Sequence, residues 1–125
     1  MILDTNALSA FAEGDEELLT QLEVAPELHL PVIVLGEYRF GVRQSRHRRA
    51  YERWLSEALR DLTVLPVLDS TTEHYAALCH ELRTAGTPIP TNDAWIAAIS
   101  REHRLPVVSR DSHFDVVRGL RRVVW

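Results

Sequence analysis

Short apolar runs alternate along this chain with longer segments in which apolar residues recur every three or four positions. The short runs are typical of buried strands and lie at 1–4, 29–31, 63–67, 107–109 and 121–125. The longer segments predict helices, which lie through Leu8 and Phe11, over 15–24, 32–44 and 47–61, from Asp69 or Ser70 to Gly86, and over 91–103. Strands that alternate with helices indicate a mainly parallel sheet that helices cover on both faces.

This order of elements predicts an α/β fold with three layers, in which a roughly five-stranded sheet lies between helices. A single domain over residues 1–125 is expected, because this length supports one core and does not divide comfortably into two. The only cysteine, Cys79, excludes an internal disulfide framework and fits a reducing compartment. No apolar run approaches the roughly 20 residues that a membrane helix needs, and the first residues lack the layout of a secretory signal. A cytoplasmic location without a membrane is therefore expected.

Four acids stand where the predicted elements reach the carboxyl edge of the sheet. Asp4 and Asp111 follow predicted strands, and Asp93 lies in the first turn of the predicted helix 91–103. Glu37 borders the apolar stripe of the predicted helix 32–44. Because parallel strands bring their carboxyl ends to one edge, these side chains are expected to converge there. Such carboxylates repel one another, and a hard divalent cation with oxygen ligands relieves that repulsion.

A cation bound by this cluster suits the hydrolysis of phosphodiesters. One ion lowers the pKa of a bound water and stabilises a phosphoryl oxygen, and two ions about 3.5–4 Å apart bind both oxygens of an in-line displacement. Polar residues next to the acids are candidates to orient the carboxylates or the bound water, namely Thr5, Asn6, Asn92 and Ser109. Each of the four acids, taken singly, is explained as well by a turn, a helix dipole or a solvated edge, and each polar neighbour by a turn or a cap, so the inference depends on the joint occurrence of the acids at strand and helix ends.

Four motifs along the chain resemble those of a known family. They are Leu-Asp-Thr-Asn at 3–6, Glu-Tyr-Arg-Phe-Gly at 37–41, Ile-Pro-Thr-Asn-Asp-Ala-Trp-Ile-Ala-Ala at 89–98 and Val-Val-Ser-Arg-Asp-Ser-His-Phe at 107–114. In this order they resemble the PIN-domain nucleases, and within that family the VapC-like ribonuclease toxins of prokaryotic type II toxin-antitoxin pairs. The resemblance spans essentially the whole chain.

The resemblance implies a PIN-like fold and a metal-dependent endoribonuclease that hydrolyses RNA with metal-activated water. It implies one or two Mg²⁺ or Mn²⁺ ions as cofactor, with an auxiliary role for Asp115 and ligands that correspond to Asp4, Glu37, Asp93 and Asp111. It also implies a homodimer and a cognate VapB-like antitoxin. Because such antitoxins bind DNA, this chain is expected to meet DNA only through its partner.

The basic residues are unevenly distributed and are all arginine. Residues 1–37 contain eight acids and no arginine or lysine, and all fourteen arginines follow, while the net charge of −4 argues against a broadly basic nucleic-acid binder. Arg39, Arg43 and Arg46 are candidates to attract RNA phosphates, which arginine binds bidentately. A solvated helix face with ordinary charge pairs explains them as well, and genomic base composition also explains an arginine-only set.

Two other functions are compatible with the same residues. A catalytically silent PIN-fold module that binds protein or RNA is disfavoured by the retained acids. A phosphotransfer enzyme with Asp4 as covalent nucleophile is disfavoured because the chain contains no lysine to neutralise an acyl-phosphate.

Overall fold

Five short strands form one parallel sheet in the computed structural model of this chain, which describes residues 1–125. The strands are β1 (Ile2–Leu3), β2 (Leu28–Pro31), β3 (Leu62–Leu65), β4 (Val107–Val108) and β5 (Arg122–Val123). Their order across the sheet is β3-β2-β1-β4-β5, and every neighbouring pair is parallel. The predicted five-stranded parallel sheet is therefore confirmed.

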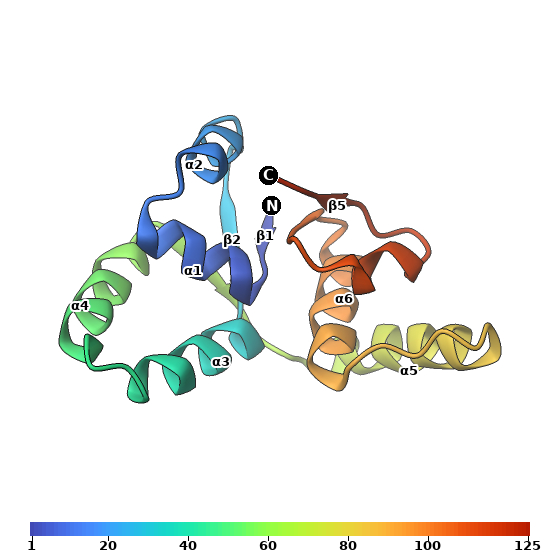
Figure 1. Ribbon diagram of the computed structural model, residues 1–125. Helices are drawn as coiled ribbons and strands as arrows, with labels where there is room; N and C mark the ends of the chain where they lie inside the picture. The colour runs from blue at the N-terminus through green and yellow to red at the C-terminus, as the bar shows by residue number, and fades with distance from the viewer.

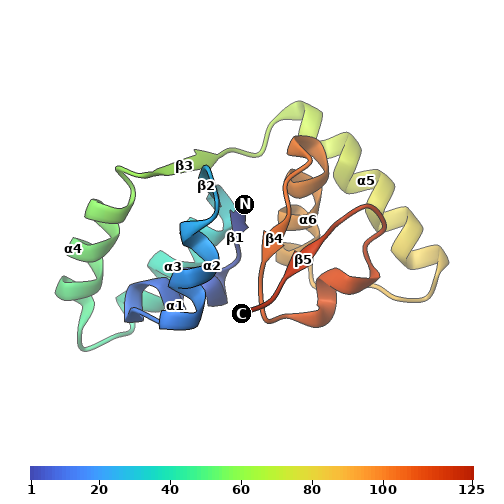
Figure 2. The ribbon, with the colours of Figure 1, turned by 90° about the horizontal axis from the view of Figure 1, so that it is seen from above.

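Helices cover both faces of this sheet. They are α1 (Thr5–Glu13), α2 (Glu16–Glu23), α3 (Val32–Arg43), α4 (Arg48–Ala58), α5 (Asp69–Thr84), α6 (Thr91–His103) and the 3₁₀ helix η1 (Ser112–Val116). The chain steps outward from β1 to β2 to β3 and then returns across β1 to β4. Because parallel crossovers are right-handed, the two directions place their helices on opposite faces. Figures 1 and 2 show α1 to α4 on one side of the strands and α5 and α6 on the other, which confirms the three-layer α/β fold.

The predicted boundaries are wrong by a few residues between α4 and β3. The predicted helix 47–61 ends at Ala58, and the predicted strand 63–67 is observed at Leu62–Leu65. After Ala58 the backbone tightens, because the N–H of Arg60 and of Asp61 each donates to the carbonyl three residues earlier. Leu62 then pairs with Leu28 of β2, so pairing with the sheet draws it out of the helical pattern.

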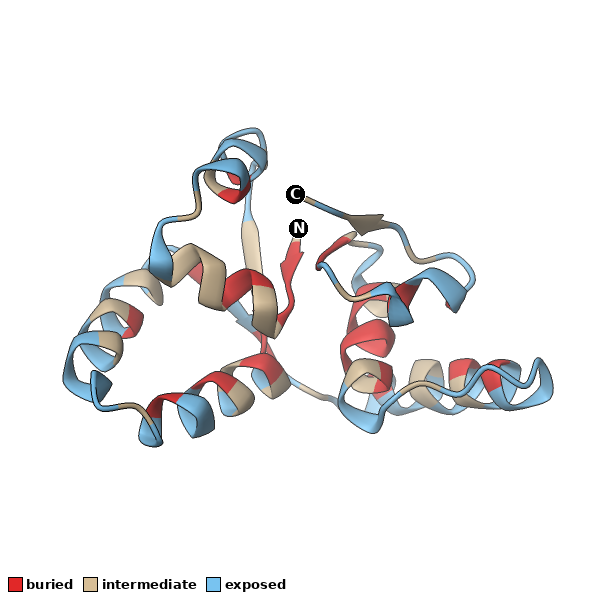
Figure 3. Ribbon diagram, in the orientation of Figure 1, coloured by how far each residue is buried: buried red, intermediate tan, exposed pale blue.

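The centre of the core lies between β1, β4 and α6. Both residues of β1 and both residues of β4 are fully buried, and α6 buries residues 94 and 96–100, as Figure 3 shows. Three of the buried α6 residues are alanines, whose small side chains allow the helix to pack closely against its neighbours. The strand ends that carry the acids are therefore attached to the least exposed part of the molecule.

Phe114 is expected to be essential for stability, because its ring is fully buried and attaches η1 to the core. Phe114→Ala is expected to lower the free energy of unfolding by about 3–5 kcal/mol. The matched control is Phe40→Ala on α3, where the ring is 67% exposed, and its expected change is below about 0.5 kcal/mol. Urea denaturation followed by circular dichroism measures both values. Equal losses in the two variants would contradict the packing of η1.

Candidate metal centre

The acids lie at the point where the strand order changes direction, between β1 and β4. One crossover leaves β1 toward β2, whereas the chain enters β4 on the other side, and open α/β sheets place their functional groups at the carboxyl ends of such strands. Asp4 follows β1 and Ser109 follows β4, and the Ser109 hydroxyl donates to Asp4 Oδ2 at 2.7 Å. The predicted meeting of the two strand ends is thus observed.

Asp4 is only 5% exposed, and its carboxylate accepts three hydrogen bonds. The backbone N–H of Thr5 donates to Oδ1 at 2.7 Å, and Asn6 Nδ2 donates to Oδ2 at 3.0 Å, beside the bond from Ser109. Three of the four polar neighbours predicted from the sequence therefore lie beside the acids. The fourth, Asn92, is exposed and forms no side-chain hydrogen bond.

Glu37 is tied to Asp4 through Thr5. The Thr5 hydroxyl donates to Glu37 Oε1 at 3.2 Å, while the Thr5 backbone N–H donates to Asp4. One residue at the start of α1 thus orients an acid from the end of β1 and an acid from the middle of α3. Glu37 is half-buried, as its predicted place at the border of the apolar stripe requires.

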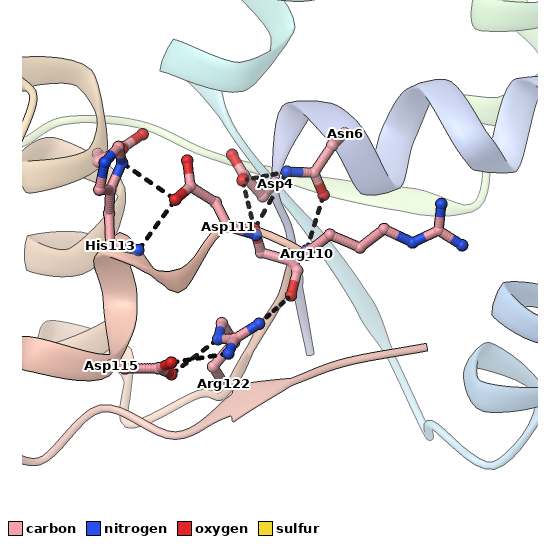
Figure 4. Close-up of polar contacts among 9 residues, drawn as sticks. Asp4, Asn6, Arg110, Asp111, His113, Asp115 and Arg122 are labelled. Atoms are coloured by element: carbon pink, nitrogen blue, oxygen red, sulfur yellow. Dashed lines mark hydrogen bonds and ion pairs between the residues drawn. The ribbon is translucent and has the colours of Figure 1, made fainter.

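Asp93 and Asp111 face each other across the imidazole of His113. His113 Nδ1 lies 2.9 Å from Asp93 Oδ2 and 3.0 Å from Asp111 Oδ1, and one potential ligand atom from each of the three residues falls within a 4.8 Å group. The His113 backbone N–H also donates to Asp111 Oδ1 at 2.9 Å. Figure 4 shows the Asp111 carboxylate pointing toward His113.

Sequence reasoning missed His113. The available signal was its position two residues after Asp111, the spacing at which an Asp side chain accepts a bond from a backbone N–H in an Asx turn. That turn starts η1 and brings the ring back toward the acid. The contact with Asp93 of α6 has no sequence signal, because it depends on how η1 packs against that helix.

The electrostatics of the buried acids favour a cation at this site. Burial raises the pKa of Asp4, hydrogen bonds from Ser109 and Thr5 partly offset it, and the charges of Asp93 and Glu37 raise the pKa further. Burial likewise raises the pKa of Asp93, the hydrogen bond with His113 lowers it, and Asp111 raises it. Both carboxylates are therefore costly to keep ionised without a positive partner.

No arginine forms an ion pair with any of the four predicted ligands, whose partners in the structure are neutral donors or His113. This leaves their negative charge available to a cation. The donor set of carboxylate oxygens with one imidazole nitrogen suits a divalent ion. The residues present thus fit the metal that the sequence predicts.

Asp115 lies outside this group. Both of its oxygens accept hydrogen bonds from Arg122, each at 2.7 Å, and this interaction lowers the pKa of Asp115. In Figure 4 its carboxylate points toward Arg122, whereas that of Asp111 points toward His113. Arg122 Nη1 also donates to the carbonyl of Ser109 at 3.2 Å. An auxiliary metal role for Asp115 stays a prediction, and the structure places the residue as part of a clamp on the loop after β4.

The three arginines predicted to bind phosphate are exposed, but the two on α3 lie on the side of the helix away from Glu37. Arg39, Arg43 and Arg46 have no hydrogen bond or ion pair within the chain. At about 100° per residue, Arg39 and Arg43 lie about 200° and 240° around the axis of α3 from Glu37. Their contact with RNA stays a prediction. Arg110 is closer to the acids, since its backbone N–H donates to Asn6 Oδ1 at 3.2 Å.

Comparison with known proteins shows the family to which this chain belongs. Residues 1–120 match the PIN domain family, and the chain belongs to it. The chain is 30% identical over 120 residues to Ribonuclease VapC5 of Mycobacterium tuberculosis, across 94% of this chain and 87% of that protein. It is 31% identical over 130 residues to VapC ribonuclease Y4jK of Sinorhizobium fredii, across 96% of this chain and 93% of that protein.

The fold is also that of a solved toxin-antitoxin structure. The chain aligns with a chain in the crystal structure of VapBC2 from Rickettsia felis bound to a DNA fragment from their promoter, with a TM-score of 0.91 and 23% identity. The alignment covers 99% of this chain and 97% of that one. At this identity the likeness shows the shared fold. The family match and the two relatives named VapC confirm the resemblance drawn from four sequence motifs.

A divalent ion is expected to stabilise the folded protein, because the cluster that binds it exists only in the folded state. At one hundred times its dissociation constant, Mg²⁺ or Mn²⁺ adds about 2.7 kcal/mol to the free energy of unfolding, which raises Tm. Asp93→Asn is expected to fold and to lose most of this increase. Asp61→Asn is the matched control, because Asp61 is exposed in the turn before β3 and lies outside the cluster, and it keeps the increase. Thermal scans with and without the ion measure the shifts. Equal shifts in Asp93→Asn and the parent would contradict the proposed placement of the metal.

Proposed function

We propose that this protein is a divalent-metal-dependent endoribonuclease toxin that hydrolyses RNA phosphodiester bonds. The observation that carries this function is the presence of four acids without arginine partners around the change of strand direction, in two pairs: Thr5 joins Asp4 to Glu37, and His113 joins Asp93 to Asp111. The charge of Asp93 also acts on Asp4, whose pKa it raises. Membership of the PIN domain family supports it, as do the two relatives named ribonucleases. The reaction class follows from the chemistry of the cluster, because a cation bound by carboxylates is suited to phosphodiester hydrolysis.

Asp4, Glu37, Asp93 and Asp111 would hold one or two Mg²⁺ or Mn²⁺ ions. When bound, such an ion lowers the pKa of a water molecule and offsets negative charge on the phosphate. Thr5 orients two of these acids, and Asn6 and Ser109 hold the Asp4 carboxylate in one rotamer. This rigidity matters because ligands that are already in place need no rearrangement when the cation and the RNA bind.

The cluster alone repels the phosphates of RNA, so cations nearby must attract the substrate. Arg110 lies beside the site, since its backbone N–H donates to Asn6 Oδ1 at 3.2 Å. Its guanidinium lies 4.4 Å from the centre of the Trp125 ring and pairs with Asp15 at 3.3 Å, so an RNA phosphate that uses this charge would replace Asp15 as its partner. Arg39, Arg43 and Arg46 would contact RNA farther from the cleaved bond.

We also propose that a VapB-like antitoxin controls this toxin. A pocket of about 190 Å³ lies between α1, α3 and α4 and includes Glu37, and its lining contains Glu13 and no basic residue. Tyr38 also lines the pocket, and its buried hydroxyl has no hydrogen-bond partner. This combination suits a basic side chain of an antitoxin. In the Rickettsia felis structure the VapBC2 pair is bound to DNA, and DNA would likewise reach this chain only through its partner.

The proposed toxin is a homodimer that acts as a single PIN domain in the cytoplasm. None of the helices combines the length and the apolar character that a bilayer crossing requires. A cytoplasmic location agrees with RNA as the substrate and with a lone cysteine as a free thiol. Size-exclusion chromatography with light scattering tests the homodimer directly.

Purified protein, freed of antitoxin, is expected to cleave RNA only when Mg²⁺ or Mn²⁺ is present. Asp4→Asn and Asp93→Asn are expected to lower the cleavage rate about 100-fold or more, because each removes a charged ligand. Asp61→Asn is the matched control, since Asp61 is exposed in the turn before β3 and lies outside the cluster. The measurement maps cleavage sites in total cellular RNA, with circular dichroism to verify folding. Undiminished cleavage by both cluster variants in a contamination-controlled assay would refute the function.

The antitoxin proposal is tested by co-expression with the small open reading frame beside the gene. The protein encoded by that reading frame is expected to co-purify with this chain and to suppress RNA cleavage. Glu13→Lys is expected to weaken the complex, because it places a positive charge in the pocket that would receive a basic side chain. Glu23→Lys on α2 is the control, since Glu23 is exposed and does not line the pocket. Equal affinities of the two variants would contradict this use of the pocket.

A further inference from the structure

We propose that His113 is a direct ligand of the bound cation through Nδ1, and that this nitrogen makes the centre prefer Mn²⁺ to Mg²⁺. The inference deepens the metal-dependent function proposed above and rests on it. It adds His113 of η1 as a ligand beside the four acids. It also assigns a preference for Mn²⁺ over Mg²⁺ to the proposed centre.

The spacing of the three donor atoms matches that of neighbouring ligands on one ion. Octahedral coordination with bonds of about 2.1 Å places adjacent ligand atoms about 3.0 Å apart. His113 Nδ1 lies 2.9 Å from Asp93 Oδ2 and 3.0 Å from Asp111 Oδ1. The separations of the nitrogen from the two oxygens are thus those of adjacent ligands on one ion, and one ligand atom from each of the three residues lies within a 4.8 Å group.

The His113 ring is delivered to this position by the backbone around it. Its own N–H donates to Asp111 Oδ1, and the Asp111 N–H donates to Ser109 Oγ at 2.9 Å. The next residue, Phe114, is fully buried and holds η1 against the core. The imidazole is half-exposed, with its side chain 48% accessible, so an ion and its remaining waters can approach from solvent.

A nitrogen ligand at this position favours one of the two ions over the other. Mg²⁺ strongly prefers oxygen ligands and keeps several waters, whereas a nitrogen ligand raises affinity for first-row transition ions such as Mn²⁺. Asp4 and Glu37 offer only oxygen, and neither forms a hydrogen bond or ion pair with His113, whose partners are Asp93 and Asp111. The nitrogen therefore belongs to the part of the centre formed by Asp93 and Asp111.

A purely positioning role for His113 gives a different result. If the ring only held the two carboxylates by hydrogen bonds, its removal would lower the affinities for Mn²⁺ and Mg²⁺ by a similar factor, because both ions use the same carboxylates. If Nδ1 binds the ion, removal weakens Mn²⁺ more than Mg²⁺. The ratio of the two affinities therefore separates a ligand from a positioning residue.

The experiment uses the metal-free full chain and the two ions as probes. Electron paramagnetic resonance gives the Mn²⁺ affinity, competition gives the Mg²⁺ affinity, and the spin-echo modulation of bound Mn²⁺ reports a coordinated imidazole nitrogen. The parent is expected to show the nitrogen signal. His113→Gln is expected to lose it and to lower the ratio of Mn²⁺ to Mg²⁺ affinity about tenfold. His80→Gln, an exposed histidine on α5 without an ion pair, is the control and keeps both.

Each remaining outcome decides against a specific claim. Mn²⁺ binding to the parent without a nitrogen signal would overturn the role of His113 and leave the metal-dependent function intact. A nitrogen signal that persists in His113→Gln, or an unchanged affinity ratio, would overturn it as well. Failure of the parent to bind either ion would overturn the proposed function together with this inference. Circular dichroism verifies that each variant is folded.

Discussion

The burial of the Asp4 carboxylate is the constraint on which the rest of the site depends. A buried charge without compensation is expensive, and three hydrogen bonds from Thr5, Asn6 and Ser109 offset only part of that cost. The residual cost is what makes a cation favourable here. The same three bonds hold the Asp4 carboxylate in one orientation, and each of its oxygens keeps a lone pair that a cation can use.

The pairing of β1 with β4 places the buried Asp4 beside the other residues of the site. These strands are only two residues long, yet they are fully buried and each pairs with a neighbour on both sides. Their alignment places Asp4 and the loop after β4 at one edge. The helix α6 and η1, which flank that loop, then supply Asp93 and His113. A site built from four distant segments thus depends on one small and rigid pair of strands.

Periodicity and motif position were enough to predict the sheet, the layers and the convergence of strand ends, because each depends on local pattern and a general rule of chain direction. Glu37 was predictable because a carboxylate beside an apolar helical stripe needs a partner. Two contacts were not predictable from the sequence, because each depends on how η1 packs against a separate element. They are the contact of His113 with Asp93 and the ion pair of Asp115 with Arg122. The end of α4 was missed because strand pairing at Leu62 overrides the local helical pattern.

The Asp4–Ser109 hydrogen bond joins residues that are 105 positions apart. During translation, the ribosome therefore releases the first acid long before it has synthesised the residues that complete the cluster. A nascent chain that ends before residue 107 contains neither β4 nor Asp111 and His113, so Asp4 then lacks its hydrogen bond from Ser109 and the cluster lacks one carboxylate and its imidazole. The candidate metal centre is therefore completed only when residues from the two ends of the chain meet.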